Sequence, residues 1–175
     1  MLDYIVLYQS QTGNTKKLAT EMFAALPGMS KDLISLDELQ SLPDADTYFI
    51  GFCVHYGTCS IEIGNVLSSL SGKNVALFGT CGIGNCADYF KSIENSANIW
   101  LEDDNHYLGA YFCQGKMPLK IRQKFEHMIR ERDCDADKIK AQLQNFDEAM
   151  IHPSQDDLHQ AAEFAQQCIQ SIQTV

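Results

Sequence analysis

The residues best suited to chemistry lie near the amino terminus, in the segment Ser10-Gln11-Thr12-Gly13-Asn14-Thr15. This segment follows an apolar, strand-like run at 4–8 and opens a helical pattern. A helix amino terminus directs unpaired N–H groups and the positive end of its dipole at one point, which attracts anions. Ser10, Thr12 and Thr15 add hydroxyls, Asn14 adds an amide, and Gly13 lets the backbone curl. The segment predicts a phosphate-monoester site; the alternative is a cap that satisfies only the helix's own N–H groups.

The elements that must position this loop alternate between strand and helix. Apolar runs predict strands at 3–8, 32–36, 48–54, 74–79 and 107–113. Helical spacing predicts helices at about 15–26, around 63–70 and at about 88–95. Such alternation is typical of an α/β protein with a parallel sheet covered on both faces. The 175 residues are expected to form a single domain, 1–175.

The carboxyl-terminal part carries more helix than such a sheet requires. Three amphipathic patterns follow Gly115-Lys116-Met117-Pro118, and only the last, which begins after Ser154, is needed to cover the sheet. The segment at about 119–150 is therefore predicted to be a helical insertion. We expect it to serve either as a lid over the site or as a surface for a partner.

The loop from Ser10 to Thr15 resembles the FMN-phosphate loop of the flavodoxins, which reads Ser/Thr-x-Thr-Gly-Asn-Thr after the first strand. The match is complete over these six positions. Gly57-Thr58, the segment 113–117 and His152-Pro153 resemble a divergent group of short flavodoxin-like proteins. The resemblance implies a doubly wound five-stranded parallel sheet in the order 2-1-3-4-5, with extra helices after the fifth strand. It also implies that FMN is the cofactor and that the protein carries electrons to a partner redox enzyme.

A ligand of such a sheet lies outside the carboxyl ends of the strands, at the switch point. The crevice is then expected at the loops after the first, third and fourth predicted strands. Tyr56 is the candidate wall for the flavin ring, and Gly57 the candidate peptide beside flavin N5. Gly82 and Gly84 would let the backbone approach the ligand, and Gln114 and Lys116 would reach the flavin edge. The remaining candidates in these loops are Val54, His55, Thr80, Cys81 and Ile83.

Other functions of the same chain have specific requirements. The best-known flavodoxins place a tryptophan in the first ring loop, whereas Trp100 lies outside both loops. This departure favours a flavin-free interaction module as one alternative, and an FMN-dependent NAD(P)H oxidoreductase with a helical lid is another. The Gly82-x-Gly84-x-x-Ala87 pattern imitates a dinucleotide fingerprint but follows the fourth strand instead of the first. Neither the acidic pair of a phosphoacceptor receiver nor the Cys-x5-Arg loop of a cysteine phosphatase is present.

Composition limits the partners and the compartment. The formal net charge of −10 disfavours nucleic acid and membrane surfaces and favours a redox partner with a basic docking patch. Seven cysteines without a Cys-x-x-Cys pair or a recognisable leader indicate reduced thiols in the cytoplasm. The five histidines are too scattered to predict a metal site. The oligomeric state does not follow from the sequence.

Overall fold

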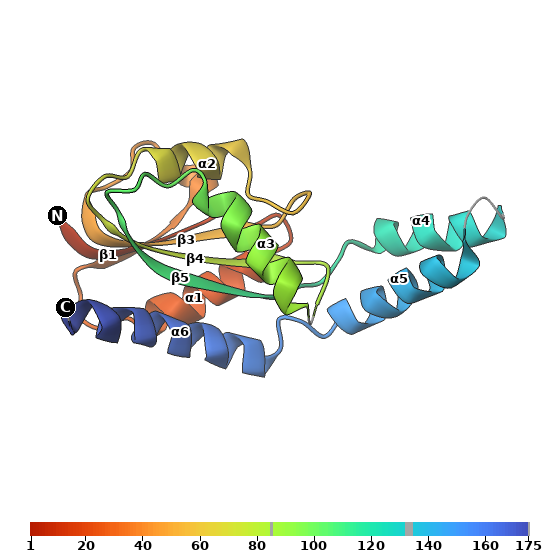
Figure 1. The fold of residues 1–175 in the computed structure, drawn as a ribbon. Helices are drawn as coiled ribbons and strands as arrows, with labels where there is room; N and C mark the ends of the chain where they lie inside the picture. Colours follow the sequence, from red (N-terminus) through yellow and green to blue (C-terminus); the bar gives the residue numbers. More distant parts are fainter. Residues whose placement is uncertain (85, 132–134, 175) are drawn as a thin grey trace.

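The computed structural model describes residues 1–84, 86–131 and 135–174. Its centre is a five-stranded parallel sheet in the order β2-β1-β3-β4-β5, so the predicted α/β class and strand order are confirmed (Figure 1). The strands are β1 (Leu2–Tyr8), β2 (Lys31–Ser35), β3 (Ala45–Cys53), β4 (Asn74–Cys81) and β5 (His106–Gln114). The helices are α1 (Asn14–Ala25), α2 (Ile61–Ser68), α3 (Ala87–Asn98), α4 (Leu119–Arg130), α5 (Ala136–Ala149) and α6 (Gln155–Gln173), with a 3-10 turn at Leu36–Glu38.

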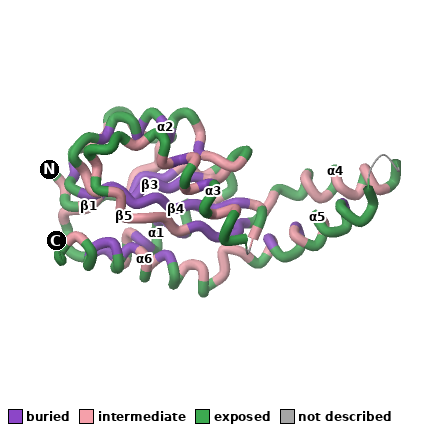
Figure 2. The backbone as a smooth tube through the Cα atoms, in the orientation of Figure 1, coloured by how far each residue is buried: buried purple, intermediate pink, exposed green. Residues whose placement is uncertain are grey.

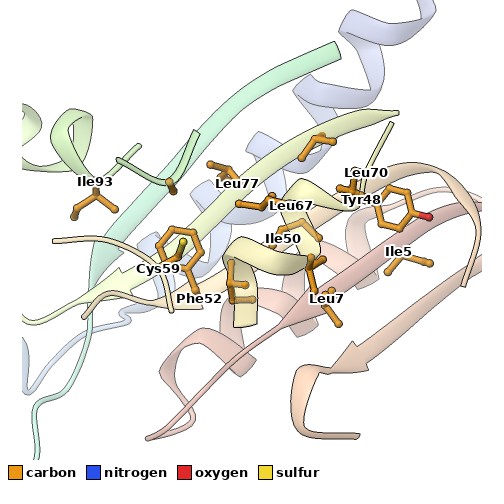
Figure 3. Close-up of a cluster of buried hydrophobic side chains, with 14 of the residues drawn as sticks. Ile5, Leu7, Tyr48, Ile50, Phe52, Cys59, Leu67, Leu70, Leu77 and Ile93 are labelled. Atoms are coloured by element: carbon orange, nitrogen blue, oxygen red, sulfur yellow. The ribbon is translucent and has the colours of Figure 1, made fainter. Parts of the chain in front are cut away.

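The two faces of the sheet are covered by different helices, because successive side chains of a strand point to opposite faces. On one face Ile5, Leu7, Ile50 and Phe52 pack against α2 and α3, as Figure 3 shows for much of this cluster. On the other face Val6, Phe49, Ala76 and Phe78 pack against α1 and α6. Strands β1, β3 and β4 are therefore apolar on both faces, as expected for the centre of a parallel sheet.

One glycine in the sheet is required by close packing. A Cβ built on Gly51 of β3 would lie 2.1 Å from Cζ of Phe78, inside the second apolar cluster. The aromatic ring fills the space that a side chain at this position would need. Trp100 shows the same relation with α2, because a Cβ on Gly64 would lie 2.6 Å from its indole ring. The tryptophan thus covers α2, away from the carboxyl ends of the strands.

The predicted insertion is two helices that project beyond the sheet (Figures 1 and 2). We call the sheet with α1, α2, α3 and α6 the α/β body, and α4 with α5 the helical hairpin. The hairpin has apolar stripes, but only Ile139, Phe146 and Ala149 of α5 are buried, and α4 has no buried residue. None of the helices in the described ranges is long and apolar enough to cross a membrane.

Strand ends differ from the sequence prediction where the site is built. Strand β4 continues through Thr80 and Cys81, which were expected in a loop, and β5 continues to Gln114. Thr80 pairs with both Cys53 and Cys113, and Cys81 pairs with Gln114. Ladder hydrogen bonds thus extend the strands past their apolar runs, which a pattern of hydrophobicity does not reveal. These residues are held by the sheet itself.

Candidate functional site

A cavity of about 460 Å³ lies at the carboxyl ends of the strands. It combines residues that follow β1, β3, β4 and β5 with the first turn of α4. Its volume is in the range of small-molecule sites. The crevice predicted at the switch point therefore exists in the structure. The lining residues are Gln11, Thr12, Asn14, Cys53, Val54, His55, Thr80, Cys81, Gly82, Gly115, Lys116, Met117, Pro118, Lys120 and Ile121.

The amino terminus of α1 forms one end of this cavity. Gly13 caps the helix in the left-handed region with φ 84°, a conformation that glycine adopts without a Cβ clash. The Ser10 hydroxyl accepts a hydrogen bond from the Lys16 backbone N–H at 3.3 Å. The first turn of α1 contains no acidic residue, so no carboxylate there neutralises the positive end of the helix dipole. The absence of a carboxylate suits an anion at this end of the cavity, and the Lys16 N–H is already bound by Ser10.

Besides Ser10, the side chains of Thr12, Asn14 and Thr15 in the predicted phosphate loop also make hydrogen bonds within the protein. The Thr15 side chain is buried, and its hydroxyl lies 2.9 Å from the Thr80 hydroxyl. Asn14 Nδ2 donates to Thr12 Oγ1 and to the Lys116 carbonyl, both at 2.9 Å. Fewer polar groups therefore remain available to a ligand than the three hydroxyls and one amide that were expected. Thr12 stays exposed at the cavity, whereas Thr15 and Asn14 connect α1 to the ends of β4 and β5.

The loop after β3 makes a tight turn. His55 and Thr58 exchange backbone hydrogen bonds of 3.0 and 3.1 Å, and the two residues between them, Tyr56 and Gly57, have positive φ angles of 50° and 81°. A two-residue turn with both φ angles positive matches the type I′ geometry. Tyr56 is the only described non-glycine residue with positive φ, and such strain is concentrated at functional sites.

Tyr56, the predicted wall for the flavin ring, does not face the cavity as expected. Its side chain is fully exposed and does not line the cavity, whereas His55 does. The two rings lie 5.6 Å apart, with an interplanar angle of 33°. Gly57 likewise lies outside the cavity lining. The apolar side chains that do line it are Val54, Met117 and Ile121.

The glycines after β4 approach protein side chains and not open space. A Cβ on Gly82 would lie 2.7 Å from Met117 Sδ, and one on Gly84 would lie 2.2 Å from Gln114 Oε1. Gly82 lines the cavity and Gly84 does not, and their close approach to a ligand stays a prediction. Ile83, whose carbonyl accepts from Cys81 Sγ at 2.9 Å, also lies outside the lining. The side chains of Met117 and Gln114 occupy the space beside these two glycines.

Gln114 connects the helical hairpin to the site. The side chain is buried, and Nε2 donates to the Gly82 carbonyl at 3.0 Å and to Asn145 Oδ1 at 3.1 Å. Asn145 Nδ2 donates to the same Gly82 carbonyl at 2.9 Å. Gln114 was predicted to face the flavin, but the structure uses its amide to hold α5 against the loop after β4. This role depends on Asn145, which no sequence pattern placed near Gln114.

Two thiols line the cavity. Cys53 is half-buried, and Cys81 is buried with its sulfur directed at the carbonyls of Ile83 and Cys113. Burial raises the pKa of the Cys81 thiol to about 12. Cys81 therefore stays protonated and is a poor nucleophile at neutral pH. Within the described part of the chain no group of acidic, cysteine or histidine side chains has the arrangement of a metal site.

The sequence did not identify the contribution of the helical hairpin to the lining. Pro118, Lys120 and Ile121 line the cavity together with Lys116 and Met117. The segment at about 119–150 was expected to serve either as a lid over the site or as a surface for a partner, and no individual residue of it was named as a lining residue. The one available signal was the short connection between the end of β5 and the first apolar position of α4. A connection this short keeps the first turn of α4 close to the carboxyl end of β5.

Comparison with known proteins agrees with this architecture. A family model described as "Flavodoxin domain" matches residues 5–166. The chain is 33% identical over 165 residues to the flavodoxin-like domain-containing protein BilS of Clostridioides difficile, covering 92% of this chain and 93% of the relative. It is 25% identical over 173 residues to BilS of Clostridium symbiosum, covering 90% of both chains. A flavodoxin structure from Streptococcus pneumoniae has the same fold, with a TM-score of 0.57, 12% identity and coverage of 96% of this chain and 98% of that one.

Proposed function

Because the chain belongs to the flavodoxin domain family, we propose that it binds FMN non-covalently and carries electrons to a partner redox enzyme. One observation carries the proposal: the cavity at the strand ends has the amino terminus of α1 at one end and apolar side chains elsewhere in its lining. This combination suits a ligand with an anionic tail and a flat apolar ring. The FMN would supply the redox chemistry, and the protein would set its binding, orientation and access to solvent.

The residues at and beside the cavity would have three tasks in binding FMN. The backbone N–H groups of the first turn of α1 and the Thr12 hydroxyl would hold the phosphate. Val54, Met117 and Ile121 would exclude water from the ring. Tyr56, at the tip of the turn beside His55, remains the predicted outer wall, and Gly57 remains the predicted peptide beside the ring. We assign no residue as a general acid or base, because electron transfer needs none.

Titration with FMN tests the proposal directly. We expect flavin absorbance and fluorescence to change on binding, and a protein that binds no FMN would instead be the flavin-free interaction module. Thr12→Ala should weaken binding by about 1.5–3 kcal/mol, since it removes a hydrogen bond to a charged group. The matched control is Thr20→Ala, because the exposed Thr20 hydroxyl donates only to the Lys16 carbonyl within α1. Equal effects of the two substitutions would mean that the phosphate binds elsewhere.

Thiol protection gives a readout that does not depend on electron transfer. Cys53 lines the cavity and is half-buried, whereas Cys86 is exposed and outside the lining. We expect excess FMN to slow the alkylation of Cys53 by iodoacetamide and to leave the alkylation of Cys86 unchanged. Peptide mass spectrometry measures both rates in one sample. Protection of neither thiol, with FMN bound, would place the ligand outside this cavity.

An FMN-dependent NAD(P)H oxidoreductase is the second candidate, and one observation favours it. Lys120 and Ile121 of α4 line the cavity, as residues of a substrate lid would. Steady NAD(P)H oxidation by the FMN-loaded protein without a partner would support this enzyme. Reduction that needs an added reductase would support the carrier. For the carrier we further propose a reducing cytoplasmic setting, which the six free thiols of the described residues support.

A further inference from the structure

The charge of α4 is opposite to that of the chain as a whole. The helix carries Lys120, Arg122, Lys124 and Arg130 and a single acidic residue, Glu126, within 12 residues. The whole chain has 13 basic and 23 acidic residues. Four of those basic residues are thus concentrated on one short helix. Local charge governs a docked complex, because salt screens charges that lie more than a Debye length of about 8 Å away.

The basic charges lie where a partner must approach. Lys116 and Lys120 line the cavity itself, and from there α4 projects away from the α/β body beside α5 (Figure 1). Lys120, Lys124 and His127 follow one another at helical spacings of four and three, so they share one face of α4. All three side chains are exposed. A protein that reaches the cavity from the hairpin side therefore meets the positive charges of Lys116, Lys120 and Lys124.

The protein does not use these lysines to stabilise itself. Arg122 is held by Glu126 at 2.9 Å and by Asp147 of α5, and it lies over the Phe146 ring. Lys120 and Lys124, in contrast, form no ion pair with any described residue. Two like charges four residues apart on a helix oppose folding slightly. Their placement beside the cavity is thus explained better by an external anionic group than by internal pairing.

The surface next to these charges is apolar. Leu119, at the start of α4, is 64% exposed, and the stripe of Ile121, Phe125, Met128 and Ile129 is only half-buried against α5. Exposed apolar side chains framed by charges are typical of protein interfaces. Asn145 donates a hydrogen bond to the Gly82 carbonyl and accepts one from Gln114, and these bonds hold the hairpin at the cavity mouth. The basic face is consequently fixed beside the proposed flavin site.

We infer that Lys116, in the connection after β5, together with Lys120 and Lys124 of α4 forms the docking surface for an acidic redox partner protein. This inference rests on the proposed electron-carrier function and refines it. Net charge alone favours a basic partner, but the positive charge at the cavity mouth selects an acidic surface for closest approach. The acidic remainder of the molecule disfavours other orientations of such a partner, because like charges repel.

Electron-transfer kinetics test the inference. Oxidised rubredoxin serves as an acidic acceptor and cytochrome c as a basic one, each mixed in stopped flow with the photoreduced, FMN-loaded protein. We expect Lys120→Glu/Lys124→Glu to slow the rubredoxin reaction about tenfold at low ionic strength, with no slowing for cytochrome c. The matched control is Lys138→Glu/Lys140→Glu, which makes the same charge change on α5 outside the cavity lining. Equal slowing by both double variants, or none by either, would overturn the inference.

Cross-linking tests the same surface without flavin. Rubredoxin carboxylates activated with a carbodiimide should form amide bonds mainly with Lys116, Lys120 and Lys124, as peptide mass spectrometry would show. Cross-links concentrated on Lys16, Lys17 or Lys138 would overturn the docking surface. A chain that binds no FMN would end the proposed function, whereas the cross-links would still decide the role of α4. Binding to phosphatidylserine vesicles or an oligonucleotide that Lys120→Glu/Lys124→Glu abolishes would reassign the face and overturn the protein-partner inference.

Discussion

The α/β body and the helical hairpin differ in how many of their apolar side chains they bury. The body buries side chains on both faces of its central strands, in two clusters separated by the sheet. The hairpin buries three residues of α5 and none of α4 (Figure 2). Buried apolar area is the dominant source of stability. The body therefore carries the stability of the fold, and the hairpin offers surface at the edge of the cavity.

Truncating an aromatic side chain in each region should give the largest contrast. Phe49→Ala opens a cavity between β3 and the helices α1 and α6 and should lower the free energy of unfolding by about 3–5 kcal/mol. Phe125→Ala on α4 removes a half-buried ring and should cost about 1 kcal/mol. Urea denaturation of both variants measures the difference. Similar losses would show that the hairpin is as well packed as the body.

Alkaline pH should weaken the body through its buried thiols. Burial raises the pKa of Cys81 and of Cys168 to about 12, and it also raises the pKa of Cys113. A thiol with a raised pKa in the folded state contributes its full stability below its unfolded pKa, and that contribution is lost as the pH rises toward the folded pKa.

Between pH 8 and pH 10 we therefore expect the free energy of unfolding to fall by about 1 kcal/mol for each of these thiols. Urea denaturation at the two pH values measures the loss. In the Cys81→Ala variant the loss should be smaller by about 1 kcal/mol, because one buried thiol is absent. The helices of the hairpin contain no cysteine. A stability that does not change over this range would show that the thiols are not held protonated by burial.

The hydroxyl pair between α1 and β4 is a smaller contribution within the body. Thr15→Val keeps the shape of the side chain but leaves the Thr80 hydroxyl without its buried partner. We expect a loss of about 1–3 kcal/mol in the free energy of unfolding. The double substitution Thr15→Val/Thr80→Val removes both hydroxyls and should recover part of that loss. A double variant as unstable as the sum of the two single variants would exclude the coupling.

The smallest effect is expected on the hairpin surface. Arg122→Ala removes exposed ion pairs with Glu126 and Asp147. Exposed pairs contribute little because water and salt screen them, so the free energy of unfolding should change by less than about 1 kcal/mol. Thermal unfolding in low and high salt measures this contribution. A loss comparable to that of Phe49→Ala would mean that the pair with Asp147 is essential for holding α4 against α5.

The fold was more predictable than the site. Alternating apolar runs and helical stripes predicted the strands and the surplus helices, because these patterns depend on neighbours in sequence. The strand order followed from the resemblance to the flavodoxins, and the structure confirms it. Strand ends were the least accurate part, as Thr80 and Gln114 show. Both are polar residues that belong to strands because ladder partners on neighbouring strands bind their backbones. In the site, the predicted loops do meet at one cavity, whereas Tyr56, Ile83 and Gly84 lie outside its lining.

The sequence by itself determined the phosphate-loop motif, the parallel α/β architecture and the presence of extra helices, since each depends on residue type and short spacing. The tertiary structure alone decided which polar groups remain available. Thr15 faces Thr80 across 65 positions of sequence, and Gln114 meets Asn145 across 31. It also directed α4 so that Lys120 lies at the cavity. Such contacts form only when distant segments pack together, and a polar side chain bonds whatever partner that packing brings within reach.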